Sequence, residues 1–392
     1  MTGALPSALS APPTAGWLDP ASCELADLVA IVETGRAMAR PVWADQIIDG
    51  VPFYRGDQVS KAMTDGSHDL QTEMIDVLLN GAGIVVVQGA FADHAVVDRV
   101  TAAFFEIIAE QKALGAVAGD HFAKPGANDR VWNALEKLAI RNPESFAQYY
   151  ANDTLAFVSA AWLGPAYQVT SQVNVVNPGG GAQAPHRDYH LGFQSNDVCR
   201  QYPQHVHVLS QVLTLQGAIA HCDMPLETGP TLYLPHSQKY VGGYLAWRRD
   251  DFTEYFEQHK IQLSLAKGDA VFFNPAVHHA AGSNRTTDVR RVANLVQISS
   301  AFGRAMESID RQAMCNALYP FLRTMAPGRQ RGHVVAACAE GYAFPTNLDR
   351  DQPVDGLAPP TQADLLLTAL ADNWQPDSLR SALADQLIRT LP

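Results

Sequence analysis

The chain has 392 residues, of which 47% are hydrophobic, enough to fill the core of one large domain or two ordinary ones. Its 40 acidic residues outnumber 28 basic ones, and the formal net charge is -12 at pH 7. No cluster of Lys or Arg is present to follow a phosphate backbone, and no apolar run reaches the roughly 18 residues of a membrane span, so neither nucleic acid nor a membrane is an expected partner.

Residues 1–70 are expected to form an N-terminal extension. The first 20 residues are rich in Ala and Pro, predict a poorly ordered arm and lack the charged start and apolar core of a signal peptide. A helix is predicted from Glu24 to about Met38. Its apolar face would carry Leu25, Leu28, Val29 and Val32.

The five cysteines are widely spaced along the chain and include no Cys-x-x-Cys pair. This pattern argues against a disulfide framework and against a structural zinc site. We therefore expect a reducing, cytoplasmic location.

A mainly β core with helical support is predicted over residues 71–303. A short buried strand is expected at 84–87, and helices at 95–112 and between 131 and 162. Further strands, separated by Gly- and Pro-rich turns, are predicted at 169–176, 205–220, 231–234, 261–265, 270–273 and 289–299. This order is typical of a double-stranded β-helix, also called a jelly roll, braced by helices. Residues 304–392 are expected to return to helices that pack on the core.

Three side chains are candidates for a metal site. His186 and Asp188 are two residues apart, so on a strand they point to the same face while Arg187 points away. A histidine of the distant pair His278-His279 would complete the set. Two imidazoles and one carboxylate leave three positions open on an octahedral ferrous ion, whereas structural zinc would take four protein ligands.

A His-x-Asp pair alone is weak support for a metal site, because the chain has 13 histidines. A second pair, His221 and Asp223, is present, and such pairs are typical of hydrogen-bonded turns. His205 and His207 also stand two apart on a predicted strand, but no Glu completes a cupin-like site, so we interpret them as structural.

Four features, taken in order, resemble the phytanoyl-CoA dioxygenase family of iron(II)- and 2-oxoglutarate-dependent oxygenases over about residues 70–300. They are the motif His186-Arg187-Asp188, the segment 223–235, the strand 268–273, and His279 followed by a Gly/Asn turn and Arg290. One departure lies at residues 235–238, where the family's Pro-Gly-Ser-His reads Pro-His-Ser-Gln.

The resemblance implies that His186, Asp188 and His279 bind Fe(II), which 2-oxoglutarate then chelates before O2 binds. It also assigns Asp223 to the middle segment, so that His221 and Asp223 are interpreted as structural. The family spacing selects His279 over His278, which is kept as an alternative because a strand slip of one residue would exchange them.

Arg290, eleven positions after His279, is the implied partner of the distal carboxylate of 2-oxoglutarate. A guanidinium suits that task because it stays charged and can donate two parallel hydrogen bonds. Arg291 lies on the opposite face of the same predicted strand, and apolar alternation does not decide between them. Gln172 and Asn174 would face the interior and either hydrogen-bond the cosubstrate or stabilise the strand's buried end.

The implied function is oxidation, first of all hydroxylation, of a C–H bond in a small organic or lipid-like substrate, with release of succinate and CO2. A carboxylate ligand such as Asp188 favours hydroxylation, desaturation or ring formation over halogenation, which needs a free position for halide. Two alternatives stay open: a metalloenzyme on the same barrel that does not use 2-oxoglutarate, and a non-catalytic small-molecule-binding protein. The two terminal regions are candidates for a lid or for the contact of a homo-oligomer.

Overall fold

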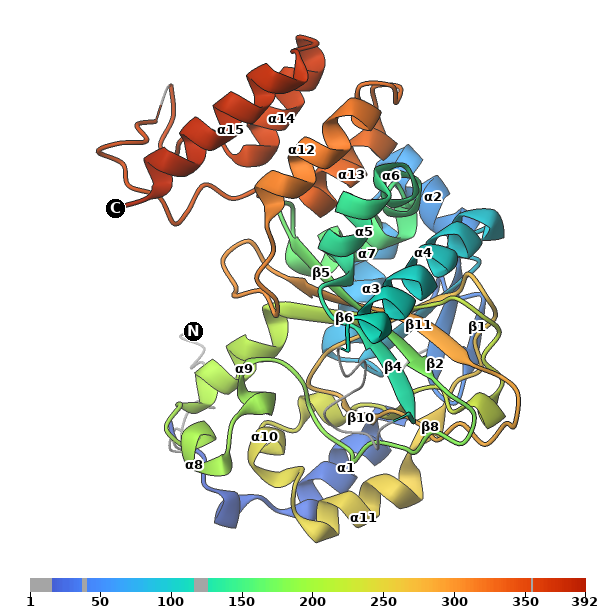
Figure 1. Ribbon diagram of the computed structural model, residues 1–392. Helices are drawn as coiled ribbons and strands as arrows, with labels where there is room; N and C mark the ends of the chain where they lie inside the picture. The colour runs from blue at the N-terminus through green and yellow to red at the C-terminus, as the bar shows by residue number, and fades with distance from the viewer. Residues whose placement is uncertain (1–15, 37–40, 116–125, 354) are drawn as a thin grey trace, which may run out of the picture.

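Two β-sheets form the centre of the computed structural model, which describes residues 16–36, 41–115, 126–353 and 355–392 (Figure 1). The large sheet has the strand order β1-β2-β3-β9-β6-β11-β5-β4, and all its neighbours are antiparallel except β2 and β3. Its strands are β1 (Gln46–Ile48), β2 (Val51–Arg55), β3 (Ile84–Gln88), β4 (Asn128–Val131), β5 (Gln168–Val176), β6 (Thr214–Ala220), β9 (Ala270–Phe273) and β11 (Arg291–Ser299). The small sheet has the order β10 (His278–Ala280), β7 (Leu232–Leu234) and β8 (Ile261–Gln262).

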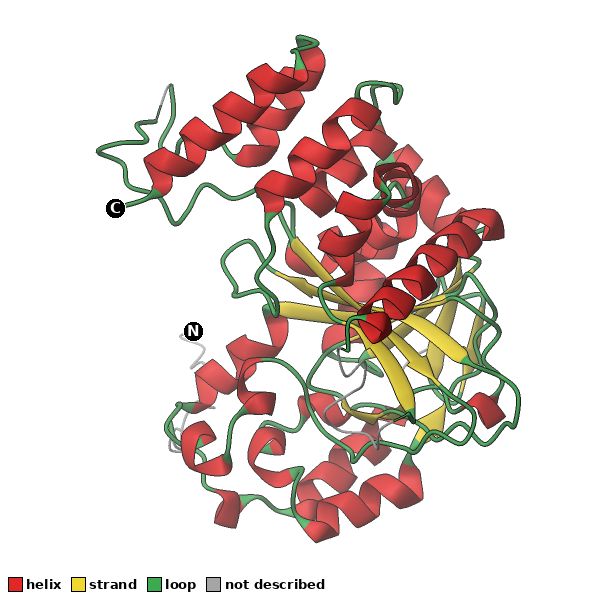
Figure 2. Cartoon of the chain, in the orientation of Figure 1, coloured by secondary structure: helices red, strands yellow, loops and turns green. Residues whose placement is uncertain are grey.

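Helices cover one face of the large sheet (Figure 2). They are α2 (Gly56–Asp65), α3 (Asp69–Leu79), α4 (His94–Ala113), α5 (Ala134–Arg141), α6 (Pro143–Tyr150), α7 (Asp153–Leu163), α12 (Arg311–Leu322) and α13 (Arg329–Cys338). The last two helices, α14 (Gln362–Ala371) and α15 (Pro376–Thr390), pack on α12 and α13 instead of on the sheet. The main apolar core lies at this interface, where Val173 and Val175 of β5 pack with Val292 and Val296 of β11. Because side chains alternate along a strand, the intervening Asn174 of β5 and Ala293 and Leu295 of β11 face the other way, toward the small sheet.

A second apolar cluster holds a lobe of short helices beside the small sheet. The helices of this lobe are α1 (Leu25–Arg36), α8 (Asn196–Cys199), α9 (Gln204–Val212), α10 (Gly243–Ala246) and α11 (Asp250–His259). Leu28 and Val32 of α1 are buried there with Phe256 of α11, and Leu25 and Val29 are partly buried against the same cluster. The predicted apolar face of this helix is therefore confirmed.

The prediction of a mainly β, jelly-roll-like core braced by helices is confirmed, although the two sheets do not close into a barrel. The predicted strands at 84–87 and 270–273 match β3 and β9. The predicted strand at 205–220 is wrong in its first half, where α9 forms and β6 begins only at Thr214. Buried His207 and Ser210 stand three residues apart, which is the helical spacing, while Val208 is exposed.

Part of the predicted N-terminal extension belongs to the large sheet, because β2 pairs in parallel with β3. The predicted arm lies mostly outside the described residues, as does Met38. The backbone carbonyl of Gly16, the first described residue, accepts a hydrogen bond from the backbone N–H of Gln204 at 2.9 Å. The division at residues 70 and 303 stays a prediction.

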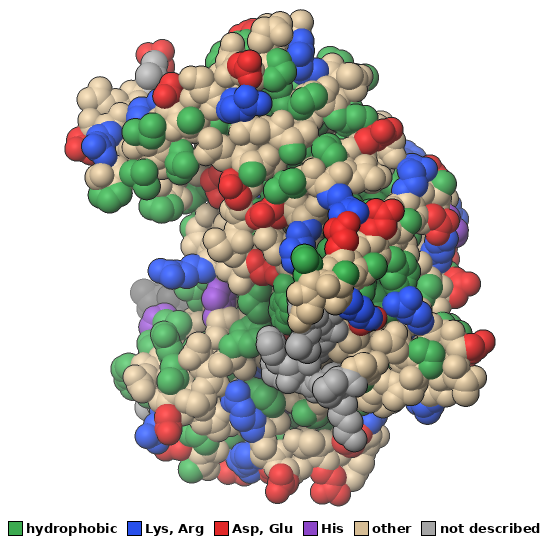
Figure 3. All heavy atoms as spheres, in the orientation of Figure 1, with side chains coloured by type: hydrophobic (Ala, Val, Ile, Leu, Met, Phe, Trp, Pro, Cys, Tyr) green, Lys and Arg blue, Asp and Glu red, His purple; other side chains and the backbone are tan. Residues whose placement is uncertain are grey.

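The C-terminal helices overhang a notch in the outline of the molecule, and hydrophobic side chains gather on them (Figure 3). Leu387, Ile388 and Leu391 at the end of the chain are all more than half exposed. A role of this region as a lid or in a homo-oligomer stays a prediction, as does a cytoplasmic location. Among the described residues, no helix is long and apolar enough to cross a membrane.

Candidate metal centre

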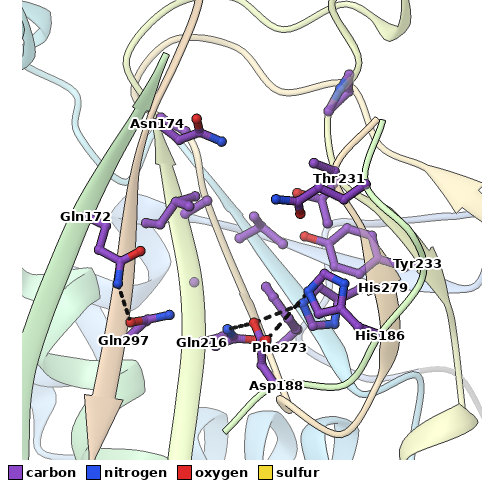
Figure 4. Close-up of a pocket in the computed structure, with 18 of the residues that line it drawn as sticks. Gln172, Asn174, His186, Asp188, Gln216, Thr231, Tyr233, Phe273, His279 and Gln297 are labelled. Carbon is purple, nitrogen blue, oxygen red and sulfur yellow. Dashed lines mark hydrogen bonds and ion pairs between the residues drawn. The ribbon is translucent and has the colours of Figure 1, made fainter. Parts of the chain in front are cut away.

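Three side chains from two distant parts of the chain converge beside the small sheet (Figure 4). His279 lies on β10, and His186 forms an isolated antiparallel bridge with it rather than a full strand. Asp188 is anchored by its backbone N–H, which donates to Pro275 O at 3.1 Å. One ligand atom from each of the three side chains lies within 4.8 Å of the others.

Both imidazoles are oriented by backbone carbonyls. Nδ1 of His186 lies 2.8 Å from Ala184 O, and Nδ1 of His279 lies 2.9 Å from Val277 O. A carbonyl can only accept, so Nδ1 carries the proton in each ring and the Nε2 lone pair is left for a metal. The two Nε2 atoms lie 3.5 and 3.3 Å from the carboxylate oxygens of Asp188.

The carboxylate of Asp188 is held in its charged form. Burial alone would raise its pKa, but the neighbouring His186 and His279, together with a hydrogen bond from Gln216, hold the pKa below its ordinary value. Gln216 Nε2 donates directly to Asp188 Oδ2. This second layer of contacts orients the carboxylate as metal sites require.

The donor set fits ferrous iron. Two neutral imidazoles and one carboxylate on one side of an ion are the facial arrangement of non-haem Fe(II) oxygenases, and they leave positions open for other ligands. Arg187, between the two motif residues, points away as expected, and its guanidinium donates to the carbonyls of Ser237 and Tyr240.

A cavity of about 530 Å³ opens from the metal centre between the two sheets. Strand register orders its wall, because Gln297 of β11 pairs with Gln216 of β6, which in turn pairs with Phe273 of β9. This row of three residues lies beside Asp188. From Gln297, the residues of β11 that face the cavity are Leu295, Ala293 and, farthest along the strand, Arg291.

The two adjacent arginines lie in different environments, and only Arg291 lines the described cavity. Arg290 is absent from the described cavity wall; it is 45% exposed, pairs with Asp129 at 3.4 Å and stacks over Phe105. Arg291 lines the cavity and is buried. None of the described residues accepts a hydrogen bond from its Nε or Nη1. Burial lowers the pKa of Arg291 to about 10, which still leaves it charged at neutral pH.

Gln172 and Asn174 both line the cavity from β5, across from the metal ligands (Figure 4). Gln172 Nε2 donates to Gln297 Oε1 at 3.2 Å. Asn174 is buried, and no described residue donates to its Oδ1. Whether they contact a cosubstrate stays a prediction.

The other histidines considered above lie away from the metal centre. His278 points to the opposite side of β10, where burial and the charge of Arg187 hold its pKa well below the ordinary value. His221 is hydrogen-bonded to Thr101 and Tyr149, both at 2.8 Å, on the helix-covered side of the sheet. His205 is exposed on α9 rather than on a strand.

Several cavity residues were not identified from the sequence. Gln216 falls in the segment whose secondary structure was partly misassigned, and only the register of β6 reveals its contact with Asp188. Tyr233 pairs with His279 in the small sheet and points its hydroxyl into the cavity (Figure 4). Its position in the matched segment 223–235 was the one available signal.

The solved structures that are similar to this chain include two enzymes of nogalamycin biosynthesis. The non-haem alpha-ketoglutarate-dependent epimerase SnoN from nogalamycin biosynthesis is 20% identical with a TM-score of 0.41, covering 60% of this chain and 82% of that one. The carbocyclase SnoK from the same biosynthesis is 17% identical with a TM-score of 0.40, covering 65% and 90%. No curated protein matches the sequence.

The family comparison is the one that identifies the chain. The sequence model described as phytanoyl-CoA dioxygenase (PhyH) matches residues 71–292, more than half of the chain. The match includes all three side chains of the metal centre and both arginines at the start of β11. The chain belongs to the phytanoyl-CoA dioxygenase family and is an iron(II)- and 2-oxoglutarate-dependent oxidoreductase.

Proposed function

We propose that this protein hydroxylates a C–H bond of a small organic molecule, with His186, Asp188 and His279 as the ligands of iron. The observation that carries the proposal is the convergence of these three side chains at the wall of a cavity whose other end holds a buried arginine. Bound iron supplies the redox chemistry, in which 2-oxoglutarate and O2 become succinate, CO2 and one oxygen atom inserted into the substrate.

Arg291 is proposed to hold the distal carboxylate of 2-oxoglutarate. Its Nε and Nη1 are buried donors that no described residue satisfies, and such donors are costly unless a ligand accepts from them. The hydroxyl of Tyr233 is also buried without a described partner, and Tyr233 lies close enough to Arg291 for their charges to interact. A carboxylate placed there would satisfy both groups.

The protein's own part in the reaction is to bind, orient and exclude water. Gln216 holds Asp188 in position, and the backbone carbonyls behind the imidazoles hold their tautomers. Apolar Phe273, Leu263 and Leu265 line the cavity and limit the water that reaches the metal. Asn174 pairs with Ala293 of β11, which is the next residue after Arg291 on the same face of that strand. We therefore propose that Asn174 hydrogen-bonds the cosubstrate.

The first test is anaerobic addition of Fe(II) and then 2-oxoglutarate to metal-free protein, watched for the visible charge-transfer band of the chelate. We expect a band that disappears in His279→Ala and needs more 2-oxoglutarate in Arg291→Gln, with Arg290→Gln as the matched control. Iron binding without a band would favour a metalloenzyme that does not use 2-oxoglutarate. Failure to bind iron would favour a non-catalytic binding protein.

Hydroxylation is tested separately from the cosubstrate. Once a substrate has been identified, turnover under ¹⁸O₂ should place one labelled oxygen atom in the product and one in succinate. A product that has lost two hydrogens and carries no label would instead identify desaturation or ring formation.

A further inference from the structure

The cavity wall is positively charged although the protein as a whole is acidic. Asp188 is its one carboxylate among the described residues, whereas four arginines border it, one of which, Arg187, turns its guanidinium away from the cavity, and the chain carries a net charge of -12. The four are Arg130, Arg187, Arg248 and Arg291. Such a local excess of positive charge selects for negatively charged ligands.

Three of the four arginines already have a role or a counter-charge. Arg291 is assigned to 2-oxoglutarate above, and Arg187 donates to backbone carbonyls on the far side of the metal-binding segment. Arg130 lies near Glu307: burial raises the pKa of that carboxyl, and the charges of Lys137 and Arg130 oppose the rise.

Arg248 lacks a counter-charge, and unlike buried Arg187, whose guanidinium points away from the cavity, its side chain is exposed. Its guanidinium donates to Gln194 O at 2.9 Å, Gly192 O at 3.4 Å and Asn196 Oδ1 at 3.3 Å, all of them neutral acceptors. No carboxylate of the described ranges lies within 4.0 Å of it. These contacts hold the guanidinium in one orientation, so little side-chain freedom remains to be lost when it binds an anion.

Aromatic side chains surround this arginine. Its guanidinium stacks 4.0 Å from the ring of Trp247, and both side chains line the cavity together with Phe193, which is 50% exposed. The indole N–H of Trp247 is buried and no described residue accepts its hydrogen bond. Aromatic walls bind flat apolar groups, and an unsatisfied N–H offers a further donor to an acceptor on the ligand.

The charges of the loaded centre balance without the substrate. Fe(II) and Arg291 contribute three positive charges, and Asp188 and doubly charged 2-oxoglutarate contribute three negative ones. Arg187 does not enter this balance because its guanidinium points away from the cavity, so the charge of Arg248 is left for the molecule that enters last.

We propose, as an extension that rests on the proposed function, that the substrate is a small molecule carrying an anionic oxygen group, a carboxylate or a phosphate, on a flat and largely apolar body. Arg248 binds the anionic group, and Trp247 and Phe193 contact the body. Arginine suits both anions because its planar fork donates two parallel hydrogen bonds to either. The cavity of about 530 Å³ has the size of a pocket for such a ligand beside 2-oxoglutarate.

The test uses three probes that share a naphthalene ring: 2-naphthoate, 2-naphthyl phosphate and uncharged 2-naphthamide. Each is titrated by calorimetry, without oxygen, into full-length protein loaded with Mn(II) and saturating 2-oxoglutarate. We expect one of the anions to bind about tenfold or more tightly than the amide. Whichever anion binds more tightly identifies the group. Arg248→Gln should remove the preference, whereas Arg200→Gln, an exposed arginine paired with Asp197, should keep it.

Three results would overturn the inference: equal binding of anions and amide, no binding of either anion at millimolar concentration, or a preference that Arg291→Gln removes and Arg248→Gln leaves. The anaerobic Fe(II)/2-oxoglutarate band, recorded on the same protein preparations, separates this inference from the proposed function. A missing band with an intact preference at Arg248 rejects the proposed function alone. A normal band without the preference rejects the anionic substrate alone.

Discussion

His186 and His279 are hydrogen-bonded to each other through both backbone groups, with N···O distances of 2.9 and 3.0 Å. This reciprocal pair brings two proposed metal ligands from distant parts of the sequence onto adjacent backbones. The ligand set therefore exists only when the segment after β5 is docked on β10. Metal binding and folding of this region should be coupled, since an ion that binds the folded state alone stabilises it.

The first prediction concerns that coupling. Mn(II) or anaerobic Fe(II) at a hundred times its dissociation constant should stabilise the wild type by about 2.7 kcal/mol. His279→Ala and Asp188→Ala should lose this stabilisation because each removes one of three ligands. Urea unfolding with and without metal measures it, and His205→Ala, an exposed histidine on α9, is the control. Equal stabilisation of His279→Ala and the control would contradict the metal assignment.

The second prediction separates two neighbouring arginines. Arg291→Gln should raise the 2-oxoglutarate concentration for half-maximal succinate formation by about ten- to a hundredfold, since a charged hydrogen bond contributes roughly 1.5–3 kcal/mol. Arg290→Gln removes a stacking contact with Phe105 and a contact with Asp129, which also pairs with Lys112 at 2.5 Å, and both lie away from the described cavity wall. Its 2-oxoglutarate demand should stay near the wild-type value. A larger effect at Arg290 than at Arg291 would reverse the assignment.

The third prediction concerns Gly243, which packs against Arg187. A Cβ added at Gly243 would overlap the Arg187 guanidinium, which is fully buried and hydrogen-bonded, so it cannot move aside freely. Gly243→Ala should cost about 1–3 kcal/mol of unfolding free energy through overpacking. It should also weaken metal binding, because Arg187 stands between His186 and Asp188.

Gly332→Ala is the control for this substitution. Gly332 lies in α13 with nothing within 4 Å of an added Cβ, so alanine there should be neutral or stabilising. Urea unfolding and metal titration of both variants give the comparison. Unchanged metal affinity in Gly243→Ala would mean that Arg187 does not position the ligands.

The fourth prediction concerns pH and His221. Burial, aided by the charge of Lys267, lowers the pKa of His221 to about 3, from an ordinary value near 6.5. The folded state therefore binds fewer protons than the unfolded state between these values. The contribution of neutral His221 to the free energy of unfolding is complete above pH 6.5. It is lost as the pH falls toward 3, by up to about 1.4 kcal/mol per pH unit.

Unfolding free energies at pH 7.5, 6 and 5 would measure this slope. Other buried histidines add to it, so the comparison is with His221→Gln, which should show a shallower fall than the wild type. Parallel curves for the two proteins would mean that His221 does not titrate as proposed.

The sequence alone determined the residue types of the proposed metal ligands and the main elements around them. The alternation rule placed His186 and Asp188 on one side because it depends only on backbone geometry, and it holds even though only a single bridge forms there. The buried strand at 84–87 and the strand at 270–273 could be predicted because a glycine turn precedes each apolar run.

The tertiary structure decided what lies on each face of β11 and β6. Val292 and Val296 pack under helices, while Arg291 and Gln297 face the cavity, so both faces are buried and hydrophobicity cannot distinguish them. The proposed choice of Arg291 over Arg290 follows from the helix layer that covers one face. The contact of Gln216 with Asp188 and the lack of a counter-charge at Arg248 likewise depend on residues distant in sequence. Local patterns specify the direction of a side chain relative to its neighbours, but only packing specifies what it meets.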